Sequence, residues 1–272
     1  MRTSLLIVFS ALLLTSCGEY QKLLRSDDTQ KKYVVMDSLY NAGKYKKALK
    51  LMEQIVPLYR GKPQAEPLMY KYANTFYHLE DFYLAGYQFE RFTISFPKSD
   101  SLEVAAYKSA RSYYELSPRY SLDQEDTRTA LEKLQNYINT YPNSEHRLEA
   151  NRLVKELREK LEKKDIEIAK QYLATAESLG TFKPAISAFD NFIGDHPGSK
   201  YRKDAFFGRF EAQYQLAINS VPSKVEARLK EAKNYYDSFA KYYSESDLKA
   251  DADKILQDIE KRLSQTTETA IN

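Results

Sequence analysis

The chain has 272 residues, of which 29% are charged, and its formal net charge is only +3. This balance argues against a DNA or RNA partner, because nucleic-acid-binding domains carry a dominant basic surface. The 23 Tyr and 13 Phe, without any Trp, suit helix seams in which a ring packs inside while a phenol reaches water. We therefore expect most of the tyrosines to be structural.

The amino terminus has the order of a secretory signal, with Arg2 followed by an apolar run over residues 5–14. This run is too short to span a bilayer, which needs about 20 residues. The following residues, Leu-Thr-Ser-Cys-Gly at 14–18, resemble a bacterial lipobox, and Cys17 is the only cysteine. We predict that residues 1–16 form a lipoprotein signal peptide, and that Cys17 carries diacylglycerol and an N-acyl chain. No other cofactor is expected.

Residues 18 and 19 lack the Asp that holds some bacterial lipoproteins at the inner membrane, and they lack the acidic run associated with surface export. By this resemblance we expect the protein at the periplasmic face of the outer membrane, anchored by lipid. With one cysteine in the sequence, an internal disulfide cannot form, so stability must come from helix packing.

A spaced phrase then recurs five times along the chain. It consists of a small Ala, bulky residues four, seven and eleven positions later, and often Pro at the twelfth position. The phrases begin at Ala48, Ala85, Ala130, Ala185 and Ala232. These offsets share one face of an α-helix, and Pro ends a helix because it lacks an N–H. The pattern predicts an all-α array of about five helical pairs with a capping helix.

The segment from Gly43 to Ala48 is similar to the turn of a tetratricopeptide repeat, whose nominal period is about 34 residues. The predicted fold is therefore a tetratricopeptide-repeat solenoid, with insertions where the alanine spacing is longer. In chain order we expect a lipidated tether at 17–28, repeats 1–3 at 29–143, a charged spacer helix at 144–164, repeats 4–5 with the cap at 165–263, and a disordered tail at 264–272.

Motifs for chemistry are absent from the sequence. It has no phosphate-binding loop, no dinucleotide-binding turn and no paired-histidine zinc motif. His78, His146 and His196 fall in different repeats, which favours packing roles over metal binding or proton transfer. We predict no catalytic residues and no metal site, and hence a protein that is not an enzyme.

The predicted binding surface is the concave face, which the first helix of each pair lines in tetratricopeptide arrays. Tyrosine and asparagine side chains there can hold an extended peptide through hydrogen bonds and ring contacts. The alternative is that several of them simply pack between helices. The candidates in the first two pairs are Tyr33, Tyr40, Tyr70, Asn74 and Tyr77, with Met36 and His78 on the same helices.

Four stretches of the chain carry a family resemblance: residues 17–24, 58–61, 117–124 and 141–144. The most specific is Ser-Pro-Arg-Tyr-Ser-Leu-Asp-Gln at 117–124, because helix packing alone does not require it. With these stretches the chain resembles the BamD family, lipoproteins of the outer-membrane β-barrel assembly machinery, and especially its Bacteroidetes-like members.

This resemblance implies an N-terminal half that receives unfolded outer-membrane β-barrel proteins and a C-terminal half that binds a POTRA domain of BamA. Other assembly-machinery lipoproteins are implied as further partners. The concave candidates become a docking site for the C-terminal signal of a barrel protein, and Arg202 and Lys203 become candidate BamA contacts. The alternative for this basic pair is a solvated charge beside Asp204, which contributes at most about 1 kcal/mol.

Other functions remain open at this level. A tetratricopeptide lipoprotein adaptor for periplasmic cell-wall hydrolases or proteases would share the lipobox and the repeats, but has no reason to carry the 117–124 phrase. A glycan-capturing lipoprotein of the SusD-like kind would usually have Trp platforms and a large insertion, and the chain has neither.

The lipobox generates the first prediction. The substitution Cys17→Ser removes the thiol that would accept the lipid, so we expect the protein to stay unprocessed or to be released from the membrane. Membrane fractionation and electrophoretic mobility measure this. Normal processing and retention of the variant at the membrane would contradict lipidation at Cys17.

Overall fold

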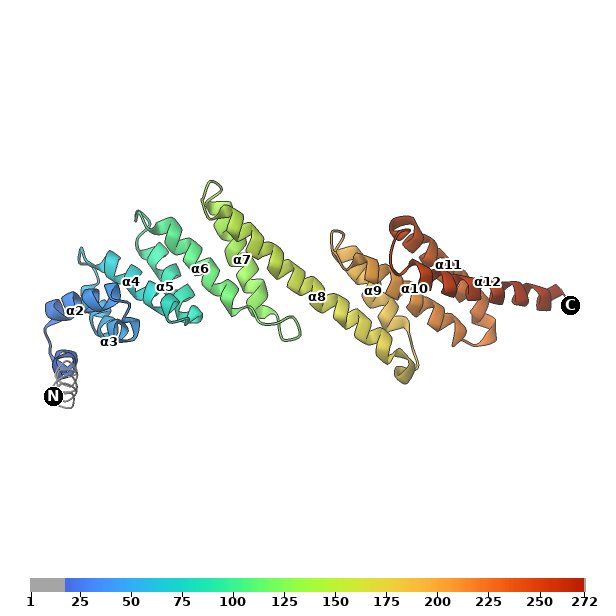
Figure 1. Ribbon diagram of the computed structural model, residues 1–272, viewed down its shortest axis with the longest axis horizontal. Coiled ribbons are helices and arrows are strands. Elements are labelled where there is room, and N and C mark those ends of the chain that lie inside the picture. Colours follow the sequence, from blue (N-terminus) through green and yellow to red (C-terminus); the bar gives the residue numbers. More distant parts are fainter. Residues whose placement is uncertain (1–17, 272) are drawn as a thin grey trace, which may run out of the picture. The chain divides into compact units, whose positions relative to one another are not determined.

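The computed structural model describes the backbone of residues 18–271 and the side chains of residues 18–265, and this described part is helical without strands (Figure 1). Cys17 lies outside the described residues. Residues 18–25 are helical. The elements that follow are α2 (Thr29–Asn41), α3 (Tyr45–Ile55), η1 (Val56–Tyr59), α4 (Ala65–His78), α5 (Phe82–Ser95), α6 (Leu102–Leu116), α7 (Glu125–Thr140), α8 (Arg147–Leu179), α9 (Lys183–Asp195), α10 (Arg202–Ile218), α11 (Pro222–Tyr243) and α12 (Lys249–Ile271).

The helices pair as the alanine phrase predicts. The first helix of each pair is α2, α4, α6, α8 or α10, and the second is α3, α5, α7, α9 or α11. Each phrase alanine lies on a second helix with no exposed surface, as Ala48, Ala85, Ala130, Ala185 and Ala232 all show. A methyl side chain lets the two helices of a pair approach closely. The predicted all-α array of tetratricopeptide pairs with a capping helix is confirmed.

The same helix break recurs after three of the second helices. Phe96, Tyr141 and His196 each donate a backbone hydrogen bond to the carbonyl four residues earlier. Each has φ between −130° and −122° and ψ near 62–65°, and each precedes a proline. A residue before proline is pushed out of the helical region, so the phrase ends its own helix. These three second helices, α5, α7 and α9, therefore stop at the same point of the repeat.

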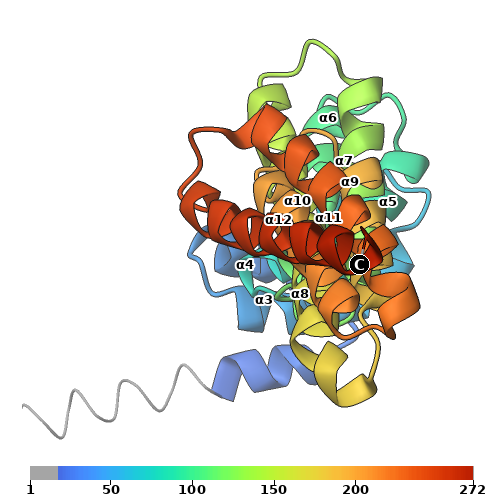
Figure 2. The same ribbon diagram turned by 90° about the vertical axis from the view of Figure 1, so that its right-hand side faces the viewer.

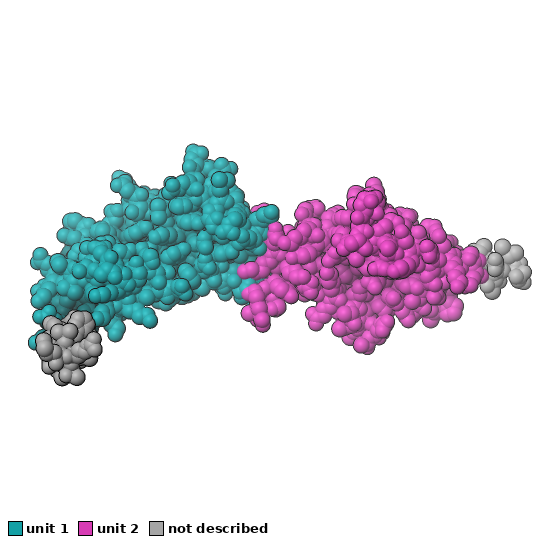
Figure 3. All heavy atoms as spheres, viewed as in Figure 1, with its two compact units in different colours: residues 1–118, 123–157 teal, residues 119–122, 158–272 magenta. Residues whose placement is uncertain are grey.

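The described chain divides into two compact units (Figure 3). Unit 1 comprises the described residues up to 118 and residues 123–157, and unit 2 comprises residues 119–122 and 158 onwards. The boundary falls within α8, a 33-residue helix. We expected a spacer helix at 144–164, but no Pro or Gly interrupts residues 147–179, so one helix continues to Gly180, which has φ +67°. The first helix of the fourth pair is thus part of the same helix.

The segment expected to be a tether is ordered where the structure describes it. Leu23 is 6% exposed and packs in the core formed by α2 and α3. The hydroxyl of Tyr20 donates to the carbonyl of Lys47 at 2.8 Å. The 18–25 helix is therefore amphipathic and docks on the first pair, because Tyr20 and Leu23 lie on one helical face.

Unit 2 is built around phenylalanines on its helices. Phe189 and Phe192 on α9 pack in one core, while Phe206, Phe210 and Phe239 form a second core with α12. Helix α12 packs on α10 and α11 (Figure 2). It continues to Ile271, eight residues beyond the expected end at 263, since residues 264–271 contain no Pro or Gly.

Among the described residues, no helix is both long and apolar enough to cross a bilayer.

The close packing of α10 against α9 generates a stability prediction. A Cβ atom at Gly208 would lie 2.4 Å from Cζ of Phe189, a ring with no exposed surface. We expect Gly208→Ala to lower the free energy of unfolding by about 1–3 kcal/mol, because the core must shift to admit the methyl group. Urea unfolding measures the change.

Gly194→Ala is the matched control, because a Cβ atom there meets nothing within 4 Å. This substitution lies in helix α9 and should leave stability unchanged or raise it slightly. If Gly208→Ala were as stable as Gly194→Ala, the close approach of Phe189 to α10 would be wrong.

Candidate functional site

The first helices of unit 1 are joined by side chains 34 residues apart. Nδ2 of Asn74 on α4 donates to the hydroxyl of Tyr40 on α2 at 2.5 Å. Oδ1 of Asn74 accepts from Nζ of Lys108 on α6 at 2.6 Å. Equal spacing on successive first helices places the three side chains at the same level of the array. We call them, together with Tyr70 and Tyr77, the groove cluster.

Asn74 is the centre of the groove cluster. It is only 5% exposed, and both ends of its amide group are hydrogen-bonded. Buried amides are costly when unpaired, so these two bonds hold the side chain in one orientation. Lys71, one turn earlier on α4, forms an ion pair with Asp37 on α2 and lies 5.3 Å from the ring centroid of Tyr40. Tyr40 is thereby held between two residues of the next repeat.

The ammonium group of Lys108 lies among three aromatic rings. Its Nζ lies 5.7 Å from the ring centroid of Tyr70, 5.6 Å from that of Tyr77 and 5.9 Å from that of Phe89. Burial lowers the pKa of Lys108. No carboxylate of the described residues forms an ion pair with it. The ring faces and the Asn74 amide therefore stabilise a charge that has no acidic partner.

Tyr70 and Tyr77 lie beside Lys108 and pack by their edges on the second helix of their pair. Tyr70 makes edge contacts with Phe89 and Phe92, and Tyr77 contacts Phe82 and Phe89. Burial raises the pKa of both phenols, so both are neutral at physiological pH. Both tyrosine rings therefore pack between helices, which is the alternative considered for the concave candidates. They also lie beside the ammonium group of Lys108.

Tyr33 lies apart from the groove cluster. Its ring stacks on Tyr59 with centroids 5.3 Å apart, and it packs against the core that contains Leu23. Met36 on the same helix is fully buried. The structure therefore brings four of the five concave candidates together and leaves Tyr33 in a helix seam.

The histidines are engaged in ring contacts. His78 stacks on Tyr45 with centroids 4.3 Å apart, and His146 stacks on Tyr107 at 4.2 Å. The His196 ring lies 4.8 Å from that of Phe192, and its Nε2 is 3.0 Å from a carboxylate oxygen of Asp165. Within the described part of the chain, no three His, Cys, Asp or Glu side chains gather in a way that could hold a metal ion.

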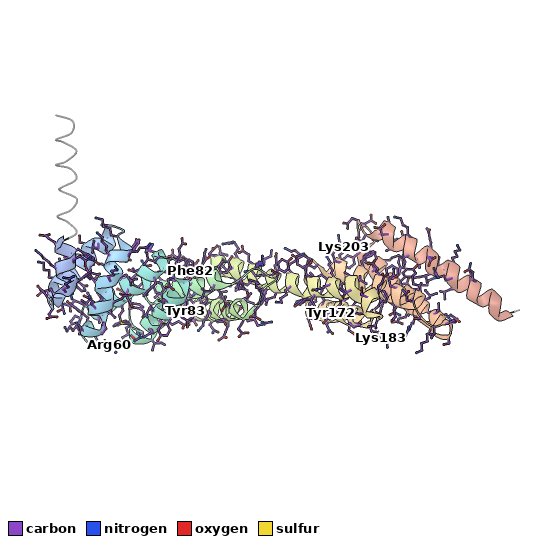
Figure 4. All side chains as sticks on the ribbon, turned by 90° about the horizontal axis from the view of Figure 1, so that it is seen from below. Arg60, Phe82, Tyr83, Tyr172, Lys183 and Lys203 are labelled. Carbon is purple, nitrogen blue, oxygen red and sulfur yellow. The ribbon has the colours of Figure 1, made fainter. Side chains whose placement is uncertain are left out.

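Arg202 and Lys203, at the start of α10 in unit 2, have different environments. Arg202 donates to the carbonyl of Ile193 at 2.6 Å, and its guanidinium lies 5.2 Å from the Phe206 ring, so it joins α9 to α10. Lys203 lies on the surface (Figure 4) and pairs with the exposed Asp247 at 2.5 Å. This hydrogen bond raises the pKa of Lys203 and lowers that of Asp247.

Asp204, the acidic residue expected beside Arg202 and Lys203, pairs with a lysine of another helix. Asp204 forms its ion pair with Lys170 on α8 at 2.7 Å, whereas Lys203 pairs with Asp247 from the segment before α12. Asp204 is 34 residues from Lys170, which is the same spacing as in the groove cluster. The surface charge available to a partner here is therefore Lys203 with Asp247.

Sequence reasoning missed Lys108. The alanine phrase follows the second helices, whose spacing varies because the connections differ in length. A comparison of the first helices at 34-residue steps would have aligned Tyr40, Asn74 and Lys108. This regular spacing is not visible in the positions of the phrase alanines, which lie on the second helices.

The chain is similar to a protein family, to a curated protein and to solved structures. Residues 25–182 match the model of YfiO, an outer membrane lipoprotein family. The outer membrane protein assembly factor BamD of Caulobacter vibrioides is 28% identical over 130 residues, a match that covers 48% of this chain and 41% of that protein. The chain thus spans less than half of that relative's length.

Two solved structures with similar helices are putative kinesin light chain proteins of Podosopora anserina with nearly identical TPR-like repeats. The first, a point variant, is 15% identical with a TM-score of 0.33, and the match covers 78% of this chain and 95% of that one. The second is 14% identical with a TM-score of 0.32, and the match covers 80% of this chain and 99% of that one.

The bridging role of Asn74 generates a prediction. Asn74→Ala leaves the half-buried Lys108 without its hydrogen-bond acceptor and Tyr40 without its donor. We expect the free energy of unfolding to fall by about 1–3 kcal/mol, measured by urea denaturation.

The control for this prediction is Asn139→Ala on α7. Asn139 is exposed and bonds only Gln135 on its own helix, so its loss should change stability by about 0.5 kcal/mol or less. Equal midpoints for wild type and Asn74→Ala would show that the groove cluster does not join the repeats.

Proposed function

The chain belongs to the YfiO family of outer membrane lipoproteins, and from this premise we propose that it is a lipid-anchored scaffold of the β-barrel assembly machinery. In this role it binds unfolded outer-membrane β-barrel proteins and couples them to BamA for folding and insertion. The family match over more than half of the chain and the similarity to an outer membrane protein assembly factor support the role. The lipid on Cys17 is part of the proposal.

The observation that carries the client-binding step is the groove cluster. It spans three first helices, and it combines a cation without an acidic partner with aromatic rings and a buried amide. An extended polypeptide lying across α2, α4 and α6 would meet Lys108 with a carboxylate and the rings with apolar side chains. Unfolded barrel proteins offer such segments, because their strands alternate apolar and polar residues.

The proposed mechanism is passive. A lipid anchor and a client-binding surface on one chain raise the effective concentration of the client beside the insertase. No cofactor takes part in this scheme, and folding of the barrel itself supplies the free energy. The chain's contribution is to hold an extended client and to place it next to BamA.

We place the BamA contact on unit 2, at Lys203. An acidic POTRA surface could replace Asp247 as the partner of this partly exposed ammonium group. Arg202 supports the contact indirectly, because its bond to Ile193 sets the start of α10. A charge pair of this kind at the rim of an interface changes the association rate more than it changes the buried contacts.

Client binding is tested with Lys108→Gln. Gln keeps a hydrogen-bond donor, on a side chain one bond shorter, while the charge is lost, and circular dichroism checks that the variant is folded. We expect at least about tenfold weaker binding of an unfolded, dye-labelled outer-membrane β-barrel protein, measured by fluorescence anisotropy, since a charge-assisted contact contributes about 1.5–3 kcal/mol. Lys98→Gln, on the exposed loop after α5, is the matched control and should bind like wild type. Equal affinities for the two variants would remove Lys108 from the site.

BamA coupling is tested with Lys203→Glu. We expect slower and weaker capture of a purified POTRA domain, measured by biolayer interferometry at low salt, because charge reversal places two acidic surfaces together. Lys183→Glu reverses an exposed charge elsewhere on unit 2 and should leave capture unchanged. Arg202→Glu is unsuitable because it would break the α9–α10 contact. Unchanged capture by Lys203→Glu would discard this contact.

A further inference from the structure

The positive charge of the chain is concentrated near its N-terminus. Residues 18–50 contain eight Lys and Arg but only four Asp and Glu, a net charge of +4, whereas the whole sequence carries +3. The remainder of the chain is therefore close to neutral. A local excess of this kind attracts anions, and the groove cluster and Lys203 do not account for it.

Four of these lysines line one cavity of about 520 Å³ on unit 1. They are Lys22 on the 18–25 helix, Lys31 on α2, and Lys44 and Lys47 at the start of α3. All four side chains are exposed, and none forms an ion pair with a described residue. We call this the lysine cavity.

The rest of the lining gives the lysine cavity two kinds of surface. Leu23, Val35 and Leu39 supply apolar side chains, and Glu19 and Asp28 are its acidic residues. Asp28 caps α2, where its Oδ1 accepts the backbone N–H of Lys31 at 2.8 Å. A cavity lined by both lysines and apolar side chains matches a molecule with a charged head and a hydrocarbon tail, because each part finds a compatible surface.

The lysine cavity is held in place by the contacts of the 18–25 helix. The Tyr20 hydroxyl donates to the carbonyl of Lys47, and the Lys47 ammonium lies 5.5 Å from the Tyr20 ring. Leu23 is buried in the first core. These contacts fix Lys22 relative to Lys47. The first residue of the lining is Glu19, so the cavity begins close to position 17, which is where the chain would leave the membrane.

We propose that the lysine cavity binds the anionic phospholipid headgroups of the membrane to which the chain is anchored. Lysines close to an anionic surface are attracted to it, and the attraction decays within a Debye length, about 8 Å at physiological salt. Acyl chains on Cys17 would attach unit 1 to the bilayer at one point, without setting its orientation. Binding of headgroups at the lysine cavity orients unit 1 against the bilayer. The inference uses the proposed anchoring for its location only.

The test uses unlipidated protein of residues 18–272, so that no acyl chain contributes to membrane binding. The shortened protein keeps Leu23, the first buried residue of the described cores. We expect the protein to float with vesicles of phosphatidylcholine mixed with phosphatidylglycerol, but not with vesicles of phosphatidylcholine alone. The triple variant K31E/K44E/K47E should partition at least about tenfold less, because each lysine contributes about a fivefold factor near an anionic surface.

The matched control is K183E/K224E/K261E, which makes the same charge change with exposed lysines of unit 2. It should retain vesicle binding. Equal loss in both triple variants would show a response to total charge and overturn the proposal. So would unchanged binding of K31E/K44E/K47E, or equal binding to the two kinds of vesicle.

A further arm distinguishes a membrane surface from a free anion. Inorganic phosphate at matched ionic strength should leave vesicle binding unchanged, whereas displacement by phosphate would indicate a site for the free ion and overturn the membrane assignment. K31Q/K44Q/K47Q, which introduces no acidic groups, should also lose binding while keeping the wild-type circular dichroism spectrum. Retained binding by this folded variant would contradict the proposal. Client and POTRA binding are measured separately, so their failure leaves this result intact.

Discussion

Each repeat depends on the close approach of two helices at one buried alanine. Ala48, Ala85 and the three later phrase alanines have no exposed surface, and bulky residues four and seven positions later fill the space on either side. A larger side chain at the alanine would separate the helices, whereas a smaller one in the neighbouring positions would leave a cavity. Because the contact repeats, side chains of successive first helices meet, as they do in the groove cluster.

The groove cluster shows how repetition brings side chains of successive repeats together. A 34-residue step brings Tyr40, Asn74 and Lys108 together, and a single buried amide links three repeats. The ammonium group of Lys108 is stabilised by dipoles and ring faces instead of a carboxylate, which leaves it available for an anion. The neighbouring rings pack on the second helix of their pair and also lie beside the ammonium group, so the same tyrosines stabilise the repeat and the charge.

The sequence predicted the parts of the fold that depend on local rules. Proline follows Phe96, Tyr141 and His196, and three second helices end just before these residues, as the repeated phrase predicts. The reason is that the residue before proline leaves the helical region. The sequence was less informative where no breaker is present, so the length of α8 and the end of α12 were underestimated. Four of the five groove candidates do meet, but the stacking of Tyr33 on Tyr59 and the position of Lys108 depend on helix rotation, which composition does not encode.

The central claim, a scaffold of outer-membrane protein assembly, is tested most directly by identifying the partners of the chain in its own membrane. A C-terminally tagged protein would be purified without crosslinking from outer membranes in mild detergent, and the partners identified by mass spectrometry. We predict a POTRA-bearing β-barrel protein as the main stoichiometric partner. Recovery of cell-wall hydrolases or a glycan transporter in its place would contradict the assembly role, while leaving the helical fold and the proposed anchor intact.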